Sequence, residues 1–142
     1  MPVTLAKTIS KIQFISNSTN AQLVKEMYEY LKSNGVSERH QHNAIKVMIP
    51  FSNYLGPSTT FFDINSKELI LVFLDTKKKS DEEDTEKKWI TTWNSYLVRI
   101  KYFFRWFSNQ RGKDAVPWAE WQTLCVLYMS LSIFLIYHQI CY

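Results

Sequence analysis

The sequence predicts an all-α domain with short connections, and three observations lead to that class. The 142 residues include only three glycines and four prolines, which is little material for the tight turns that join β-strands. No segment alternates apolar and polar residues as a half-buried strand does, whereas several segments repeat apolar residues at a helical spacing. Capping residues separate these segments at short intervals. Because the length suits a single domain, the expected architecture is helix packed on helix.

The first helix is expected from about Ala21 to Ser33, with Asn20 as its N-cap and Asn34-Gly35 as its C-terminal stop. Residues 1–19 are rich in Ser, Thr and Asn, so they are expected to form a flexible N-terminal arm. Within that arm, only a short segment near Ile12–Ile15 is expected to dock on the domain.

Two further helices are expected between the first helix and residue 77. Ser37 is positioned to cap a second helix, from Glu38 to about Leu55, which Gly56 ends. The spacing Asn65-x-x-Glu68 is typical of a capping box and predicts the start of a third helix. The run Leu69–Leu74 is apolar on every side, so the third helix is expected at the centre of the core.

A charged connector, residues 77–88, leads to the fourth helix. Its five basic and five acidic residues give no net charge, as in a solvated linker. The acidic residues also precede the fourth helix, where negative charge interacts favourably with the helix dipole. This helix is expected to continue to about Asn109.

The fourth helix separates two kinds of side chain onto opposite faces. At a 3.6-residue period, one face carries Trp89, Trp93, Tyr96, Leu97, Ile100, Phe103, Phe104 and Phe107. The opposite face carries Thr91, Asn94, Ser95, Arg99, Tyr102 and Arg105. Seven lysines and arginines but no acidic residue occur from residue 87 to residue 113. A helix face without negative charge suits the major groove of DNA, which is a polyanion.

Each of these features also has a purely structural interpretation. The aromatic face can be a core stripe instead of a platform on which bases stack. Tyr102 and Trp106 fall off that stripe, and they can stack on DNA, meet a missing catalytic domain or pack against the N-terminal arm. Arg99 and Arg105 can contact DNA, line a solvated flank or pair with the acidic connector.

The composition bounds the class of protein. The net charge of +4 permits a nucleic-acid partner but does not require one. Cys125 and Cys141 belong to no ligand pattern and are expected to be reduced thiols in a cytoplasmic protein, since no signal peptide is evident. His40 and His42 lie two residues apart and so do not share a helix face. Neither a metal, nor a cofactor, nor a catalytic histidine is expected.

Two stretches together resemble a known module. The second helix begins Ser37-Glu38-Arg39-His40, and the fourth carries Trp93-Asn94-Ser95-Tyr96-Leu97-Val98-Arg99-Ile100-Lys101-Tyr102-Phe103-Phe104-Arg105-Trp106. With the four-helix layout, this pattern resembles the SAM-like core-binding domain of tyrosine recombinases (the phage-integrase family), most of all archaeal members. The resemblance covers residues 20–122 and is specific at residues 88–107. It leaves residues 1–19 as the arm and residues 123–142 as a hydrophobic tail.

The resemblance implies that the chain binds double-stranded DNA. In this family the core-binding domain clamps one face of a half-site, with its second and fourth helices in the major groove. Carried onto this sequence, the implied contacts on the second helix are Ser37, Arg39, His40, Asn43 and Lys46. On the fourth helix they are Lys88, Thr91, Thr92, Asn94, Ser95, Arg99 and Arg105. A full-length recombinase at the same site is a further expected partner.

Catalysis is not expected from this chain. The family's catalytic domain would supply several arginines, a His-x-x-Arg pattern and a nucleophilic tyrosine. After Gln122 the sequence has His138, which Gln-Ile-Cys follows, and Tyr142, which has no basic partners. The sequence therefore predicts a DNA-binding module, truncated or a fragment, that does not cleave strands.

The last 19 residues, 124–142, contain no Asp, Glu, Lys or Arg. Three interpretations are open for this tail: a membrane span, the product of a frameshift, or a helix docked on exposed core. The first gives an alternative function, a tail-anchored membrane protein with a small helical cytosolic domain. A third function, a helical module whose basic helix binds an acidic protein, also fits the sequence.

Overall fold

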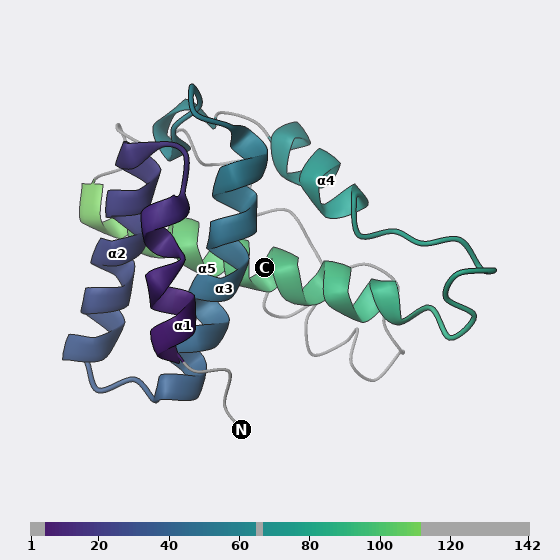
Figure 1. Ribbon diagram of the computed structural model, residues 1–142, viewed down its shortest axis with the longest axis horizontal. Coiled ribbons are helices and arrows are strands. Elements are labelled where there is room, and N and C mark those ends of the chain that lie inside the picture. The colour runs from purple at the N-terminus through teal and green to yellow at the C-terminus, as the bar shows by residue number, and fades with distance from the viewer. Residues whose placement is uncertain (1–4, 65–66, 112–142) are drawn as a thin grey trace.

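The computed structural model describes residues 5–64 and 67–111, and all its regular elements in these ranges are helical (Figure 1). The predicted all-α class is confirmed. The α-helices are α1 (Leu5–Ser10), α2 (Ser18–Ser33), α3 (Glu38–Leu55), α4 (Glu68–Asp75) and α5 (Lys88–Arg111). Two short 3-10 turns are η1 (Ile12–Phe14) and η2 (Phe61–Asp63).

The helices α2 and α3 form an antiparallel pair, and the other helices pack around this pair (Figure 1). Helix α1 lies on the viewer's side of the pair and contacts α3, whereas α5 crosses behind it and contacts α3 from the far side. Helix α4 lies beside the first half of α5. Helices α1 and α5 are therefore separated by the α2–α3 pair.

The N-terminal segment differs from the flexible arm that the sequence predicts. Residues 5–15 form α1 and η1, and Thr8, Ile12 and Ile15 are buried against the rest of the domain. The expected docking near Ile12–Ile15 is present, but the helix before it was not expected. The polar composition of this segment gives no sign of α1, because the helix packs through a few side chains rather than through a full apolar stripe.

Helix α2 begins three residues earlier than predicted. Its N-cap is Asn17, whose side-chain oxygen accepts a hydrogen bond from the backbone N–H of Asn20 at 3.0 Å. The prediction that Asn20 is the cap is therefore wrong. Asn20 is instead fully buried, where it donates to the carbonyl of Thr59 and accepts from the N–H of Phe61, both at 2.9 Å. Both asparagines have the residue type of a cap, and only tertiary contacts distinguish them.

The expected limits of α3 are confirmed. The Ser37 hydroxyl accepts a hydrogen bond from the N–H of His40 at 3.3 Å, as an N-cap does. At the other end, Gly56 has φ +84°, a conformation that favours glycine and stops the helix. Pro50 lies inside α3.

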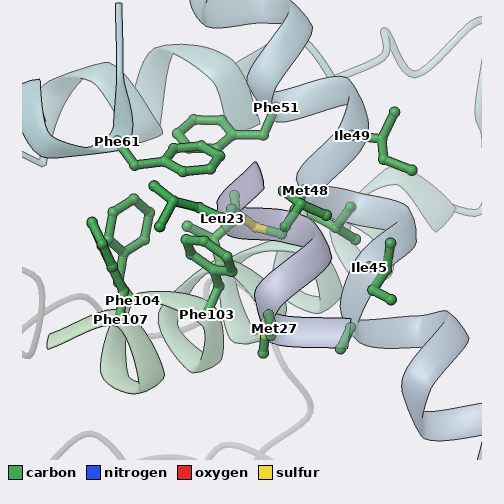
Figure 2. Packing of buried hydrophobic residues seen from close by; sticks show 14 of the residues in the cluster. Leu23, Met27, Ile45, Met48, Ile49, Phe51, Phe61, Phe103, Phe104 and Phe107 are labelled. Atoms are coloured by element: carbon green, nitrogen blue, oxygen red, sulfur yellow. The ribbon is translucent and has the colours of Figure 1, made fainter. Parts of the chain in front are cut away.

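An aromatic cluster fills the core between α3, η2 and α5 (Figure 2). The Phe61 ring lies 4.9 Å from Phe103 and 5.8 Å from Phe104, centroid to centroid, in edge-to-face geometry. Phe51 stacks on Phe61 at 6.2 Å, and all four rings are fully buried. Burying each such side chain contributes about 1.5–3 kcal/mol, so this cluster fixes how α5 crosses α3.

Helix α4 does not lie at the centre of the core, so that prediction is wrong. Ile70, Phe73 and Leu74 are buried, but Leu69 is 38% exposed and Val72 is 55% exposed. The helix covers the edge of the domain with one side only, although its sequence is apolar on every side (Figure 1). Asn65, the predicted cap, lies outside the described residues.

The connector is exposed, as predicted, and one of its carboxylates caps α5. Asp84 accepts a hydrogen bond from the N–H of Trp89 at 2.8 Å. Desolvation raises the pKa of Asp84, but backbone hydrogen bonds from Lys88 and Trp89 and the charges of Lys79 and Lys88 outweigh it and lower the pKa. The acidic connector thus stabilises the start of α5.

Candidate nucleic-acid interface

The aromatic packing of α5 determines which of its polar residues reach solvent. The inward residues Trp93, Leu97, Ile100, Phe103, Phe104 and Phe107 are buried, which confirms the core interpretation of the aromatic stripe. On the outer side, the exposed candidates are Lys88, Thr91, Thr92, Ser95 and Arg105, and Arg99 is half-buried. Tyr102, which was considered for stacking on bases, is 40% exposed on the same side. We call Thr91, Ser95, Arg99, Tyr102 and Arg105 the α5 polar stripe.

Asn94 does not belong to this surface. It is 5% exposed and lies on the flank of α5 next to the buried residues. The prediction that Asn94 contacts DNA requires a side chain that can reach a base edge, and a buried amide cannot do so without unpacking the helix. A helical period of 3.6 residues puts Asn94 on the polar face. It is buried because the buried side of α5 is wider than the aromatic stripe alone.

Arg99 and Arg105 are not engaged by the acidic connector. The ion pairs found at the connector are Lys88–Glu86 at 3.2 Å and, with the last residue of α4, Lys78–Asp75 at 3.4 Å. Neither pair involves Arg99 or Arg105. This removes one of the structural interpretations of the two arginines and leaves them as a solvated flank or as anion contacts.

Trp106 is a packing residue. It is 8% exposed, and its ring lies 6.1 Å from Tyr30 of α2 and 5.5 Å from Phe103. Its indole N–H has no hydrogen-bond partner among the described residues. Arg99 precedes Trp106 by two helical turns and therefore lies on the same flank of α5. Stacking of Trp106 on DNA is excluded by its burial.

The candidates on α3 are accessible near the start of that helix. Ser37, Arg39, His40 and Lys46 are exposed, and Asn43 is half-buried. Arg39 and Lys46 lie seven residues apart and therefore share one face, about 10.5 Å from each other along the axis. Ser37 already has a structural role as the cap of α3. No hydrogen bond or ion pair within the described residues joins the α3 candidates to those of α5.

A cluster around His42 was missed by sequence reasoning. Thr8 Oγ1 of α1 lies 2.9 Å from Nδ1 of His42, which ties α1 to α3. Burial lowers the pKa of His42, and the nearby charges of Lys46 and Lys11 lower it further. The sequence offers one sign of this cluster. No acidic residue precedes Glu26, whereas the segment predicted as a flexible arm contains Lys7 and Lys11.

Within the described ranges, no three His, Cys, Asp or Glu side chains come close enough together to hold a metal ion. Among these same residues, no helix combines the length and the apolar character needed to cross a membrane. The hydrophobic tail and both cysteines, Cys125 and Cys141, lie outside the described residues.

Comparison of the chain with protein-family models, with curated proteins and with solved structures found no match. These comparisons therefore assign the chain to no family. The remaining evidence on function is the chemistry of α3 and α5 and the resemblance of residues 88–107 to the core-binding domain of tyrosine recombinases.

Proposed function

We propose that this chain binds duplex DNA as the core-binding module of an integrase-type tyrosine recombinase and does not itself cleave DNA. One observation carries the proposal: aromatic packing turns most of the polar side of α5 outward, and the exposed part has hydroxyl groups and arginines but no carboxylate. A duplex attracts such a surface, whereas a helix that only needs solubility usually mixes both charges.

The residue types suit the two kinds of contact that DNA offers. Arginine can donate two hydrogen bonds to the edge of guanine, so Arg99 and Arg105 are the candidates for base contacts on α5. The hydroxyl groups of Thr91 and Ser95 can donate to phosphate oxygens, which position the protein without reading sequence. On α3, Arg39 near the start of the helix would likewise donate to phosphate oxygens.

The resemblance to the integrase family supports α3 and α5 as the two groove-facing helices. In the structure α3 and α5 contact each other directly, and the Phe51 ring of α3 lies 6.4 Å from the Phe104 ring of α5.

The decisive experiment measures affinity of the full chain for random duplex DNA across a salt series. The slope of log affinity against log salt is about −0.9 per neutralised phosphate. Replacing Arg99 and Arg105 by alanine removes up to two contacts, so the slope should become less steep by up to about 1.8. The control replaces Lys25 and Lys32, two exposed lysines of α2, by alanine and removes the same charge elsewhere.

Equal slopes for the wild type, the arginine variant and the lysine control would contradict the proposal. In that case, a basic helix that binds an acidic protein becomes the better explanation. A tail-anchored protein is tested separately, by recovery of the chain in the membrane fraction after an alkaline carbonate wash.

A core-binding module that occupies half-sites would compete with a complete recombinase for them. Overexpression of this chain in a cell that carries a related integrase should therefore reduce integration. The Arg99 and Arg105 variant, produced at the same level, should restore it.

A further inference from the structure

Two adjoining pockets form a groove along α2. The larger pocket, of about 510 Å³, lies between the second half of α2 and the end of α5, and it is lined by Glu26, Glu29, Tyr30, Ser33, Trp106 and Gln110. The smaller pocket, of about 390 Å³, is lined by Leu23, Phe62 and polar residues from the first half of α2. Glu26 lines both pockets, so we treat them together as the α2 groove. Both have the volume of a typical ligand site.

The larger pocket is acidic. Both acidic residues of α2, Glu26 and Glu29, line it, and no basic residue of the described ranges does. Glu29 is exposed, and it forms no hydrogen bond or ion pair with another described residue. Lys25 and Lys32 lie four residues before and three residues after Glu29 but do not pair with it. The pocket therefore attracts a cation, in contrast to the α5 polar stripe.

Two aromatic rings meet in the same pocket. The Tyr30 ring of α2 lies 6.1 Å from the Trp106 ring of α5, centroid to centroid, at an angle of 47°. Figure 1 shows α5 crossing behind α2 near its end. A cation within about 6 Å of an aromatic ring is attracted by the electron-rich face of that ring. Carboxylates beside such rings favour the ammonium of a lysine or the guanidinium of an arginine.

The pocket also contains a hydrogen-bond donor without a partner. Trp106 is 8% exposed, and its indole N–H is buried with no acceptor among the described residues. Buried donors are nearly always paired, and an unpaired one costs free energy. A cation alone does not satisfy this donor, whereas a carbonyl oxygen does. A peptide carries both a side-chain cation and backbone carbonyls, so it matches both features of the pocket.

The smaller pocket suits an apolar side chain. Leu23 and Phe62 line it, and Phe62 is 36% exposed while its ring packs on Phe107 at 4.8 Å. Gln22 at this pocket and Glu29 at the larger one are two helical turns apart, or about 10.5 Å along α2. An extended chain covers this distance in about three residues. An apolar and a basic residue three positions apart would therefore reach both pockets.

We propose that the α2 groove binds an extended segment of a partner protein, with a lysine or arginine in the larger pocket and an apolar side chain in the smaller one. A backbone carbonyl of the segment accepts the indole N–H of Trp106. Because this N–H is buried, a side chain at the pocket must rotate first, and the exposed Tyr30 packs directly on Trp106. The inference goes beyond the proposed function and does not depend on DNA binding.

The test uses an acetylated seven-residue peptide of glycine and serine that contains one leucine and one arginine three positions apart, prepared in both orders. Titration into the full chain should move the NMR signal of the Trp106 indole N–H, which is identified by its absence in Trp106→Phe. Replacing the arginine of the peptide by citrulline keeps its shape but removes its charge. This replacement should weaken binding about tenfold.

Variants of α2 should change the affinity in opposite directions. Glu29→Gln should weaken binding of the arginine peptide about tenfold, because it removes the partner of the cation. Lys32→Gln removes a like charge beside the pocket and should strengthen binding by up to about fivefold. The matched control is Glu82→Gln, which removes an exposed carboxylate of the connector and should leave the affinity unchanged. Loss of fold does not strengthen binding, so it does not explain this pattern.

Three outcomes would overturn the proposal. The first is absence of binding by the full chain, and the second is equal affinity for the arginine and citrulline peptides. The third is self-association of the chain that Glu29→Gln abolishes, which would assign the groove to a second copy of this protein. None of these results bears on DNA binding by α3 and α5, and a failed salt series with DNA leaves the groove untouched.

Discussion

The two halves of α5 are held in the domain in different ways. In the second half, Ile100, Phe103, Phe104 and Phe107 are all fully buried against α3 and η2. In the first half, only Trp93 and Leu97 reach that degree of burial. The first half is also supported by the Tyr96 ring, which stacks on Phe73 at 6.1 Å, and by several polar contacts. Trp93 Nε1 donates to Asp75 at 3.2 Å, the Trp89 N–H donates to Asp84, and the Lys77 ammonium lies 5.0 Å from the Tyr96 ring.

The difference shows that one half of α5 anchors the helix in the core, whereas the other half presents polar side chains to solvent. The second half carries the packing that fixes the fold, whereas the first half carries the exposed hydroxyl groups of Thr91, Thr92 and Ser95. Segments with fewer buried contacts open at lower free energy than the core does. The candidate interface therefore begins in the part of α5 that can adjust most easily to a partner.

The largest expected effect on stability comes from removing a buried aromatic ring from the second half of α5. Phe103→Ala should destabilise the domain by about 3–5 kcal/mol, because it removes a fully buried ring that packs on Phe61. Chemical denaturation followed by circular dichroism measures this loss. The control is Tyr102→Ala at the neighbouring exposed position, which should change stability by less than about 0.5 kcal/mol. Equal losses at the two positions would contradict the assigned faces of α5.

The second effect concerns the polar support beneath the same cluster. Asn20→Ala leaves the carbonyl of Thr59 and the N–H of Phe61 without their partner, and each unsatisfied group costs about 1–3 kcal/mol. The expected loss for the two groups is therefore about 2–6 kcal/mol in the same denaturation experiment. As a matched change, Asn34→Ala removes an exposed hydrogen bond to Tyr30 and should cost less than about 1 kcal/mol. A loss for Asn20 no larger than that for Asn34 would argue against the buried network.

How much of this was predictable depends on whether the signal is local. The helical class, the cap at Ser37, the stop at Gly56 and the inner face of α5 follow from spacing and residue type, and the structure confirms them. Asn20, Asn94 and Trp106 were misplaced because their positions depend on contacts with distant segments. For the same reason, periodicity could not show that α4 lies at the edge. The partner of α1 was hidden since Thr8 and His42 are 34 residues apart.

A smaller effect is expected in the first half of α5. Asp75→Ala leaves the buried Trp93 ring in place but removes the acceptor of its hydrogen bond, so it should cost about 1 kcal/mol. The sharper form is a double-mutant cycle with Trp93→Phe, which cancels the packing lost with the indole ring and isolates the interaction between the two side chains. A coupling energy near zero would mean that packing of the Trp93 ring alone holds this half.

The smallest effect is a dependence on pH at the start of α5. The pKa of Asp84 is lower in the folded chain than its ordinary value of 3.8, so its carboxylate stabilises the fold above that pH. This contribution is lost as the pH falls through the lowered pKa of the folded state. The stability difference between the wild type and Asp84→Ala, measured in urea, should therefore be present near neutral pH and disappear in strong acid. A difference that persists after the carboxyl group is protonated would assign the effect to something other than its charge.

The hydrogen bonds at the start of α2 also bear on the order in which the chain folds. The short turn between α2 and α3 joins one end of this helical pair, and at the other end Asn17 and Asn20 donate to the carbonyls of Pro57 and Thr59. The turn closes the pair at one end and the side chains of Asn17 and Asn20 close it at the other, before any residue of α5 is needed. Such a hairpin is a natural folding nucleus, since its contacts require only short loops to close. Mutations at Asn20 should then slow folding, whereas mutations in the second half of α5 should mainly speed unfolding.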